Sequence, residues 1–131
     1  EIGINAFQQS AFTVALEEDE IVRGVRLPIL SDAARWGYYK ICRKPGEFAE
    51  SIGAYVYDPP SRVARLVLAG TEAAPLLLES AAATIAQTDG TRFDTEAASK
   101  ALTETGEAFD PFKLRMHAIA LQRAVERAYS A

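Results

Sequence analysis

The chain has 131 residues, of which 49% are hydrophobic and 24% are charged, as expected for one soluble globular domain with a hydrophobic core. Its formal net charge of -4 argues against a general attraction to nucleic acid or to a membrane surface. A single cysteine excludes an internal disulfide framework and favours a reducing, cytoplasmic compartment. The first residue is Glu1 and not Met, so we expect the chain to be a piece of a longer protein.

The first thirty residues predict an irregular beginning with one short strand, followed by a longer strand. Residues 1–19 have no helical period and are expected to form an extended lead-in, with a short strand at 12–15 and a solvated acidic turn at 17–20. Residues 21–27 (IVRGVRL) alternate in polarity and end at Pro28, which predicts a strand with one open face. Val22 is expected on that open face.

An aromatic segment at residues 36–57 predicts two further strands joined by a turn. In the first, Trp36, Tyr38 and Lys40 share one face, whereas Tyr39 lies on the other. Residues 44–47 (KPGE) have the Pro-Gly signature of a tight turn. With a strand at 51–57 and one at 63–69, residues 20–70 predict an antiparallel sheet of three or four strands.

The last sixty residues predict three helices within 74–129. The first runs from Pro75 to about residue 87, and Asp94 is expected to cap the second. Asp110 and Pro111 begin the third, which carries one apolar stripe suited to packing on a sheet. The predicted fold is α+β: an antiparallel sheet followed by three helices packed on one face, in a single domain spanning 1–131.

Few residues indicate chemistry by themselves. The sequence contains no Walker loop and no GxGxxG turn, and His117 and Cys42 stand in separate elements without the spacing of metal ligands. We expect a surface or packing role for His117 and a structural role for Cys42. Lys40 has two interpretations: a surface lysine whose stem lies along aromatic rings, or a cation directed at an anionic or carbonyl-bearing ligand. The basic last helix is either a solvated face or a surface for an acidic partner.

A family resemblance is carried by two segments of the sequence, 17–28 (EEDEIVRGVRLP) and 39–53 (YKICRKPGEFAESIG). Together they resemble the C-terminal domain of the flavoprotein, or medium, subunit of molybdenum hydroxylases, the family of carbon monoxide dehydrogenase and xanthine dehydrogenase. That family has an acidic DEI strand ending in Pro, then an aromatic strand and a GD(F/W)A turn. Here Glu47 replaces the usual Asp of that turn, and the last helix matches the family's basic motif only approximately.

The resemblance implies a role in flavin chemistry. Such a subunit holds FAD, which receives electrons from iron–sulfur clusters, while a separate molybdenum-cofactor subunit hydroxylates the substrate. By position, Val22 and Lys40 match family residues that reach FAD, and Tyr39 matches an aromatic near the flavin. The family's phosphate-binding loops lie in an N-terminal lobe that this sequence lacks, so we expect the isolated domain to be inert and to bind little or no FAD.

Two alternatives stay open. One is a stand-alone interaction domain of the same fold, which holds a protein partner without a cofactor. The other is an unrelated α+β domain that binds a small molecule.

Overall fold

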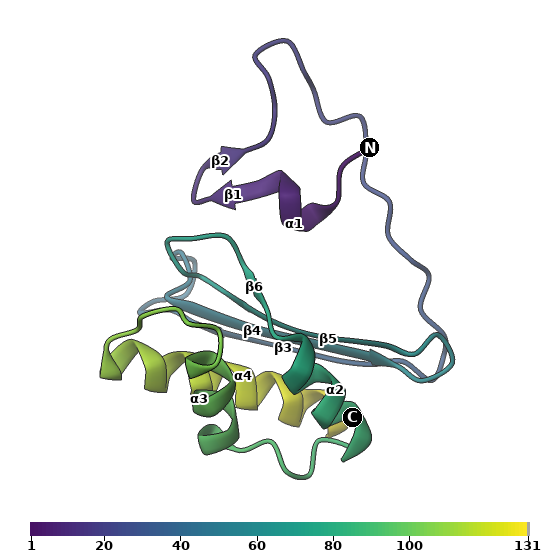
Figure 1. Cartoon of the computed structure of the whole chain (residues 1–131), viewed down its shortest axis with the longest axis vertical. Helices are drawn as coiled ribbons and strands as arrows, with labels where there is room; N and C mark the ends of the chain where they lie inside the picture. Colours follow the sequence, from purple (N-terminus) through teal and green to yellow (C-terminus); the bar gives the residue numbers. More distant parts are fainter. Residues whose placement is uncertain (131) are drawn as a thin grey trace.

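The fold consists of a sheet with helices on one face and an N-terminal arm over the other (Figure 1). The computed structural model describes residues 1–130. The four-stranded antiparallel sheet has the order β3-β4-β5-β6, and α2, α3 and α4 cover one face. This confirms the predicted α+β architecture. The elements of this part are β3 (Arg35–Ile41), β4 (Ser51–Asp58), β5 (Val63–Ala69), β6 (Leu76–Leu77), α2 (Glu79–Gln87), α3 (Thr95–Thr103) and α4 (Pro111–Tyr129).

A seam of small residues brings α4 close to the sheet. Gly37 of β3 and Gly53 of β4 face the helix, and a Cβ atom on Gly53 would lie 2.3 Å from the carbonyl oxygen of Ala120. A Cβ atom on Gly37 would lie 1.9 Å from the carbonyl oxygen of Ala124. Only glycine therefore allows this approach, because no real Cβ atom tolerates such distances.

The core lies between the sheet and the helices. The predicted apolar stripe of α4 is confirmed, because Ala118, Leu121, Val125 and Ala128 are buried and Leu114 is half-buried. The largest fully buried apolar side chains come from β5 and all three helices: Leu66, Leu68, Ile85, Leu102, Leu121 and Val125.

Two carboxylates cap the helices as predicted. Asp94 accepts a hydrogen bond from the backbone N–H of Ala97 at the start of α3. Asp110 accepts from the N–H groups of Phe112 and Lys113 at the start of α4. Each cap satisfies donors that the first helical turn leaves without a partner.

The predicted strand at residues 21–27 is wrong. These residues have no regular secondary structure, and every side chain from 21 to 30 is exposed. An alternating pattern shows that a segment can form a strand, but a strand needs a neighbour for its backbone groups. None of the described residues provides one for this segment, and the sheet takes its fourth strand from β6 instead.

Helix α2 begins later than the sequence predicts, at Glu79 instead of Pro75. Residues 76–77 pair with Val67 and Leu68 of β5, and the N–H of Leu78 donates to the carbonyl of Leu66 at 2.8 Å. The helix therefore starts at Glu79. The backbone groups of Leu76 and Leu77 pair with the edge of β5 instead of forming a helical turn. A short apolar run such as this one is compatible with either a strand or a helix.

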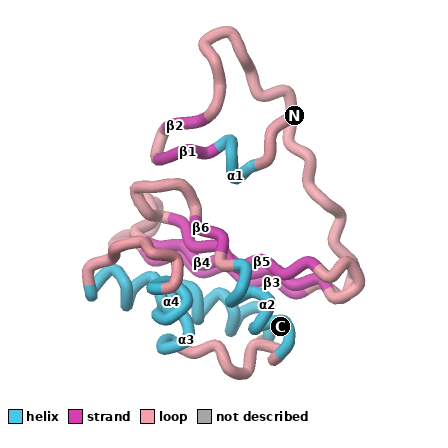
Figure 2. Tube along the Cα trace, in the orientation of Figure 1, coloured by secondary structure: helices cyan, strands magenta, loops and turns pink. Residues whose placement is uncertain are grey.

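The N-terminal arm is more structured than an extended lead-in (Figure 2). It contains a helical turn, α1 (Ile4–Phe7), and a hairpin of β1 (Gln8–Ser10) with β2 (Thr13–Val14), so the strand predicted at 12–15 is present over two residues. A bridge between Ser10 and Ala73 ties the hairpin to the loop before β6. Within residues 1–130, no helix is long and apolar enough to cross a membrane.

Candidate functional site

Strand β3 presents the candidate residues on two different faces. As predicted, Trp36, Tyr38 and Lys40 are exposed on the face without helices, while Gly37 is buried and Tyr39 is half-buried on the helix side. The alternation of a β-strand therefore separates Lys40 from Tyr39.

A shallow pocket lies beside Lys40 on the open face. It has a volume of about 360 Å³ and is lined by Tyr38, Lys40, Ile52 and the turn residues 46–49. The Nζ atom of Lys40 donates to the carbonyl oxygen of Glu47 at 2.7 Å. An ammonium group has three N–H donors, so two remain for a ligand. The pocket thus combines a cation with aromatic and aliphatic walls.

The turn that supplies half of this pocket has the predicted Pro-Gly form. The N–H of Glu47 donates to the carbonyl of Lys44 at 3.2 Å, and Gly46 has a φ of +90°. A side chain at that position would be strained, because this φ lies in the left-handed half of the map. Arg43 lies 3.7 Å from the carboxylate of Glu47 and 3.4 Å from that of Glu50, which links both ends of the turn.

Tyr39 lies between the sheet and α4. The guanidinium carbon of Arg127 is 4.7 Å from the centre of the Tyr39 ring, within the range of a cation–π contact. The same guanidinium donates to the backbone carbonyl of Tyr38 at 2.8 Å. This geometry gives Tyr39 a packing role within the domain.

Val22 stands apart from the other two candidate residues. It belongs to the unpaired segment of the arm, its side chain is 53% exposed, and it does not line the pocket beside Lys40. The structure therefore brings Val22 into no common site with Lys40. Its predicted place on the open face of a strand is wrong, because that strand does not form.

His117 forms a buried polar pair that the sequence did not indicate. Its Nδ1 atom lies 2.8 Å from the hydroxyl oxygen of Ser51, and both residues are almost fully buried. Burial and the nearby Lys113 lower the pKa of His117, whereas Asp110 opposes this shift. The Phe109 ring packs edge-on against the imidazole. The partner of His117 is 66 positions away in sequence, so spacing could not reveal it.

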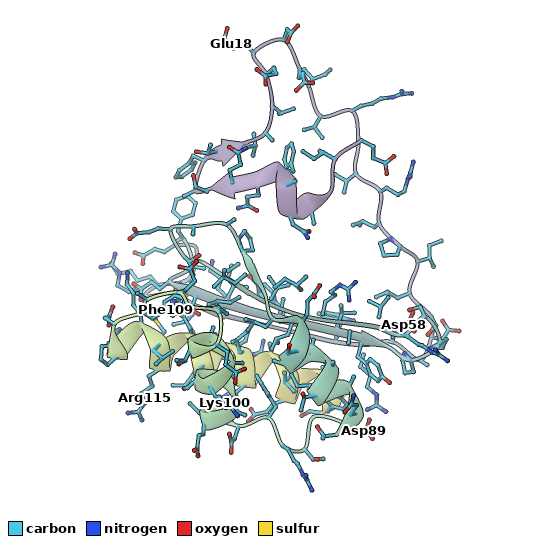
Figure 3. All side chains as sticks on the ribbon, viewed as in Figure 1. Glu18, Asp58, Asp89, Lys100, Phe109 and Arg115 are labelled. Carbon is cyan, nitrogen blue, oxygen red and sulfur yellow. The ribbon has the colours of Figure 1, made fainter. Side chains whose placement is uncertain are left out.

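The basic side chains of α4 are largely engaged inside the chain. Arg123 pairs with Glu126 at 3.0 Å, and Lys113 lies 4.0 Å from Glu72. Arg115 points away from the sheet (Figure 3) and lines a second open pocket between α3 and α4, of about 570 Å³. None of the three predicted site residues lines that pocket. No cluster of three or more potential metal ligands forms among residues 1–130.

Comparison with known proteins shows what the chain is similar to. No protein-family model matches the chain. It is homologous along almost its whole length to the medium chain of carbon monoxide dehydrogenase, and its fold matches solved structures of such dehydrogenases. The medium chain from Afipia carboxidovorans is 27% identical over 139 residues, which covers 97% of this chain and 47% of the relative.

Two solved structures show the same similarity. Carbon monoxide dehydrogenase from Oligotropha carboxidovorans matches with a TM-score of 0.72 and 28% identity, over 96% of this chain and 47% of that one. The enzyme from Hydrogenophaga pseudoflava, in a form lacking the Mo-pyranopterin moiety, matches with a TM-score of 0.72 and 25% identity, over 95% and 47%. The chain thus spans about half the length of the proteins it matches.

Proposed function

We propose that this chain is the C-terminal domain of a flavoprotein subunit that helps to enclose FAD in a molybdenum-hydroxylase complex. The observation that carries the proposal is Lys40, which stands in a pocket on the open face of a domain homologous to the carbon monoxide dehydrogenase medium chain. In the complete complex, FAD would pass electrons from iron–sulfur clusters to an external acceptor. No catalysis is expected from this domain alone.

The pocket suits one part of FAD and not the other. Lys40 has N–H donors available for the oxygen and nitrogen acceptors of a flavin ring edge, and a cation there would stabilise the electron-rich reduced ring. The diphosphate finds no comparable receptor, since the sequence lacks a phosphate-binding glycine loop and Lys40 is the only cation that lines the pocket. The domain would therefore contribute to a flavin site whose other half lies elsewhere.

The uncovered surfaces support a partner for this domain within the same subunit. The open face of the sheet exposes Trp36 and Tyr38, and the arm exposes a series of large apolar side chains. Exposed apolar area of this extent marks a surface that another unit covers. We propose that the N-terminal FAD-binding lobe covers it, while iron–sulfur and molybdenum-cofactor subunits complete the assembly. In residues 21–29 of the arm these exposed apolar side chains are Ile21, Val22, Val25, Leu27 and Ile29.

The test is the flavin content of the complete gene product compared with that of residues 1–131. We expect one FAD per complete subunit, measured by flavin absorbance after gel filtration, and weak or no binding by the 131-residue chain in a fluorescence titration. Tight stoichiometric binding by the 131-residue chain alone would contradict the division of the site between two lobes. A complete subunit without FAD would contradict the proposed function itself.

The same exposed surfaces also favour a second candidate, a stand-alone interaction domain without a cofactor. The coding sequence upstream of Glu1 distinguishes the two proposed functions. A coding region upstream of Glu1 with AGGT- or TIGG-like glycine loops supports the flavoprotein subunit. An initiator methionine directly before Glu1 supports the stand-alone domain.

A further inference from the structure

The N-terminal arm is tied to the sheet at two places, one near each end of β4. Beside the start of β4, the hairpin of the arm forms the bridge between Ser10 and Ala73. At the other end of β4, the arm joins the domain at Ser31, which contacts Asp58, the last residue of that strand. A strand of eight residues places these two attachments roughly 25 Å apart.

Between the two attachments the arm makes no polar contact with the rest of the domain. The hydrogen bonds and ion pairs that the structure describes for residues 16–30 all stay within residues 1–30, as does the pair of Arg26 with Glu1 at 2.9 Å. Every side chain from 21 to 30 is exposed. The course of this segment over the open side of the sheet therefore depends on how its two ends are held (Figure 1).

The attachment at the hairpin is the weaker of the two. Phe12 at the hairpin tip meets Phe48 edge-on with ring centres 6.4 Å apart, but the two side chains are 97% and 87% exposed. The N–H of Ala11 donates to the carbonyl of Glu72 over a long distance of 3.4 Å. Contacts that bury so little apolar surface stabilise a position only weakly.

The attachment at Asp58 is built from a buried carboxylate. Asp58 is 2% exposed and accepts hydrogen bonds from the backbone N–H of Ser31 at 3.3 Å and from the Ser31 hydroxyl. The hydroxyl of Ser61 donates to the same carboxylate at 2.8 Å. The hydrogen bonds from Ser31 and Ser61 lower the pKa of Asp58, so the acceptor is ionised at neutral pH. Hydrogen bonds to an ionised acceptor are about twice as strong as those between neutral groups.

We infer that Asp58 and Ser31 are a positioning pair that fixes the direction in which the arm extends from the sheet. Because the hairpin attachment is weak, this pair holds the arm over the open face. In the complete subunit the same pair sets the position of the N-terminal lobe relative to the pocket beside Lys40, and this part of the inference rests on the proposed function. Ser61 supports the carboxylate without tying it to the arm, since it follows Asp58 by three residues.

The experiment uses the complete subunit and measures amide hydrogen exchange in residues 8–15 together with the dissociation constant of FAD. Ser31→Ala removes the hydroxyl that joins the arm to Asp58. A hydrogen bond to a charged group is worth a factor of about ten in an equilibrium constant. We therefore expect exchange of the Ala11 amide to become about tenfold faster, because that N–H is protected only while the hairpin is in place. The dissociation constant of FAD should rise about tenfold, because binding must then also order the arm.

Ser61→Ala is the matched control. It removes a hydroxyl from the same carboxylate but leaves the arm attached, so exchange in residues 8–15 and FAD affinity should both stay at the wild-type value. Ser31→Thr keeps the hydroxyl and should also keep both values. Thermal unfolding of Ser31→Ala and Ser61→Ala should be alike, which would show that a general loss of stability does not cause the difference in exchange.

The outcomes separate this inference from the proposed function. Equal exchange of residues 8–15 in Ser31→Ala and Ser61→Ala overturns the positioning pair. Faster exchange in Ser31→Ala with unchanged FAD affinity supports the pair as the anchor of the arm and overturns its effect on the flavin site. A complete subunit that holds no FAD overturns the proposed function, while the exchange measurement still decides whether the pair positions the arm.

Discussion

Tyr39 and Lys40 are neighbours in the chain but lie on opposite faces of the sheet. The ammonium group of Lys40 donates to the Glu47 carbonyl at the open pocket, whereas the ring of Tyr39 lies under the Arg127 guanidinium against α4. The two residues therefore serve different purposes, and substitutions at each should affect different measurements.

Tyr39→Ala should lower the stability of the domain and leave the pocket intact. It removes a half-buried ring and its contact with Arg127, with an expected loss on the order of 2 kcal/mol in the free energy of unfolding. Urea denaturation of the 131-residue chain measures this. A large change in FAD affinity of the complete subunit, without loss of stability, would instead place Tyr39 at the flavin.

Lys40→Met should change the flavin site and leave the stability of the domain unchanged. The substitution keeps an apolar stem on the sheet but removes the charge, so the reduced flavin loses a stabilising cation. In the complete subunit we expect a lower flavin midpoint potential or an FAD dissociation constant raised about tenfold, with unchanged thermal stability. Spectroelectrochemical titration and fluorescence provide the two values. Wild-type potential and affinity together would remove Lys40 from the site.

Gly53→Ala should loosen α4 from the sheet. The added Cβ atom would meet the Ala120 carbonyl at 2.3 Å, so strand or helix must shift, with an expected cost of about 3 kcal/mol. Gly24→Ala is the control, because a Cβ atom there has no neighbour within 4 Å. Its expected effect is below about 0.5 kcal/mol. Equal unfolding midpoints for the two variants would contradict the close approach of α4.

His117 should make the domain less stable in mild acid. Burial lowers its pKa in the folded chain below the value near 6.5 of the unfolded chain, so the unfolded chain takes up the proton first. The free energy of unfolding should therefore fall as the pH drops from about 6.5 toward the folded pKa. Lys113 of the same helix and Asp110, the N-cap of that helix, act on this histidine, and Ser51 faces it from β4.

Urea denaturation between pH 8 and pH 5 tests this effect, with His117→Gln as the comparison. The same pH dependence in both proteins would show that other groups are responsible. The range avoids the titration of Asp58, whose pKa is lowered below 3.8 by hydrogen bonds from Ser31 and Ser61. That carboxylate lies where the arm meets the end of the sheet (Figure 3), and its contribution is lost only at lower pH.

The sequence by itself determined the features that depend on neighbouring residues. The faces of β3 follow from the two-residue period of a strand, and the caps at Asp94 and Asp110 bond to groups two or three residues away. The turn at 44–47 follows from the Pro45-Gly46 pair, and Gly46 has the positive φ that the turn needs. Each of these is decided by local dihedral angles and short-range hydrogen bonds, which a linear pattern records.

Only the tertiary structure decided which segments meet. Residues 21–27 have a strand pattern but no partner, whereas Leu76 and Leu77 look helical and pair with β5. The Ser51–His117 pair and the Phe12–Phe48 contact join positions far apart in the chain. Which segment pairs with the edge of a sheet depends on how distant segments pack together, and a linear pattern does not record that packing.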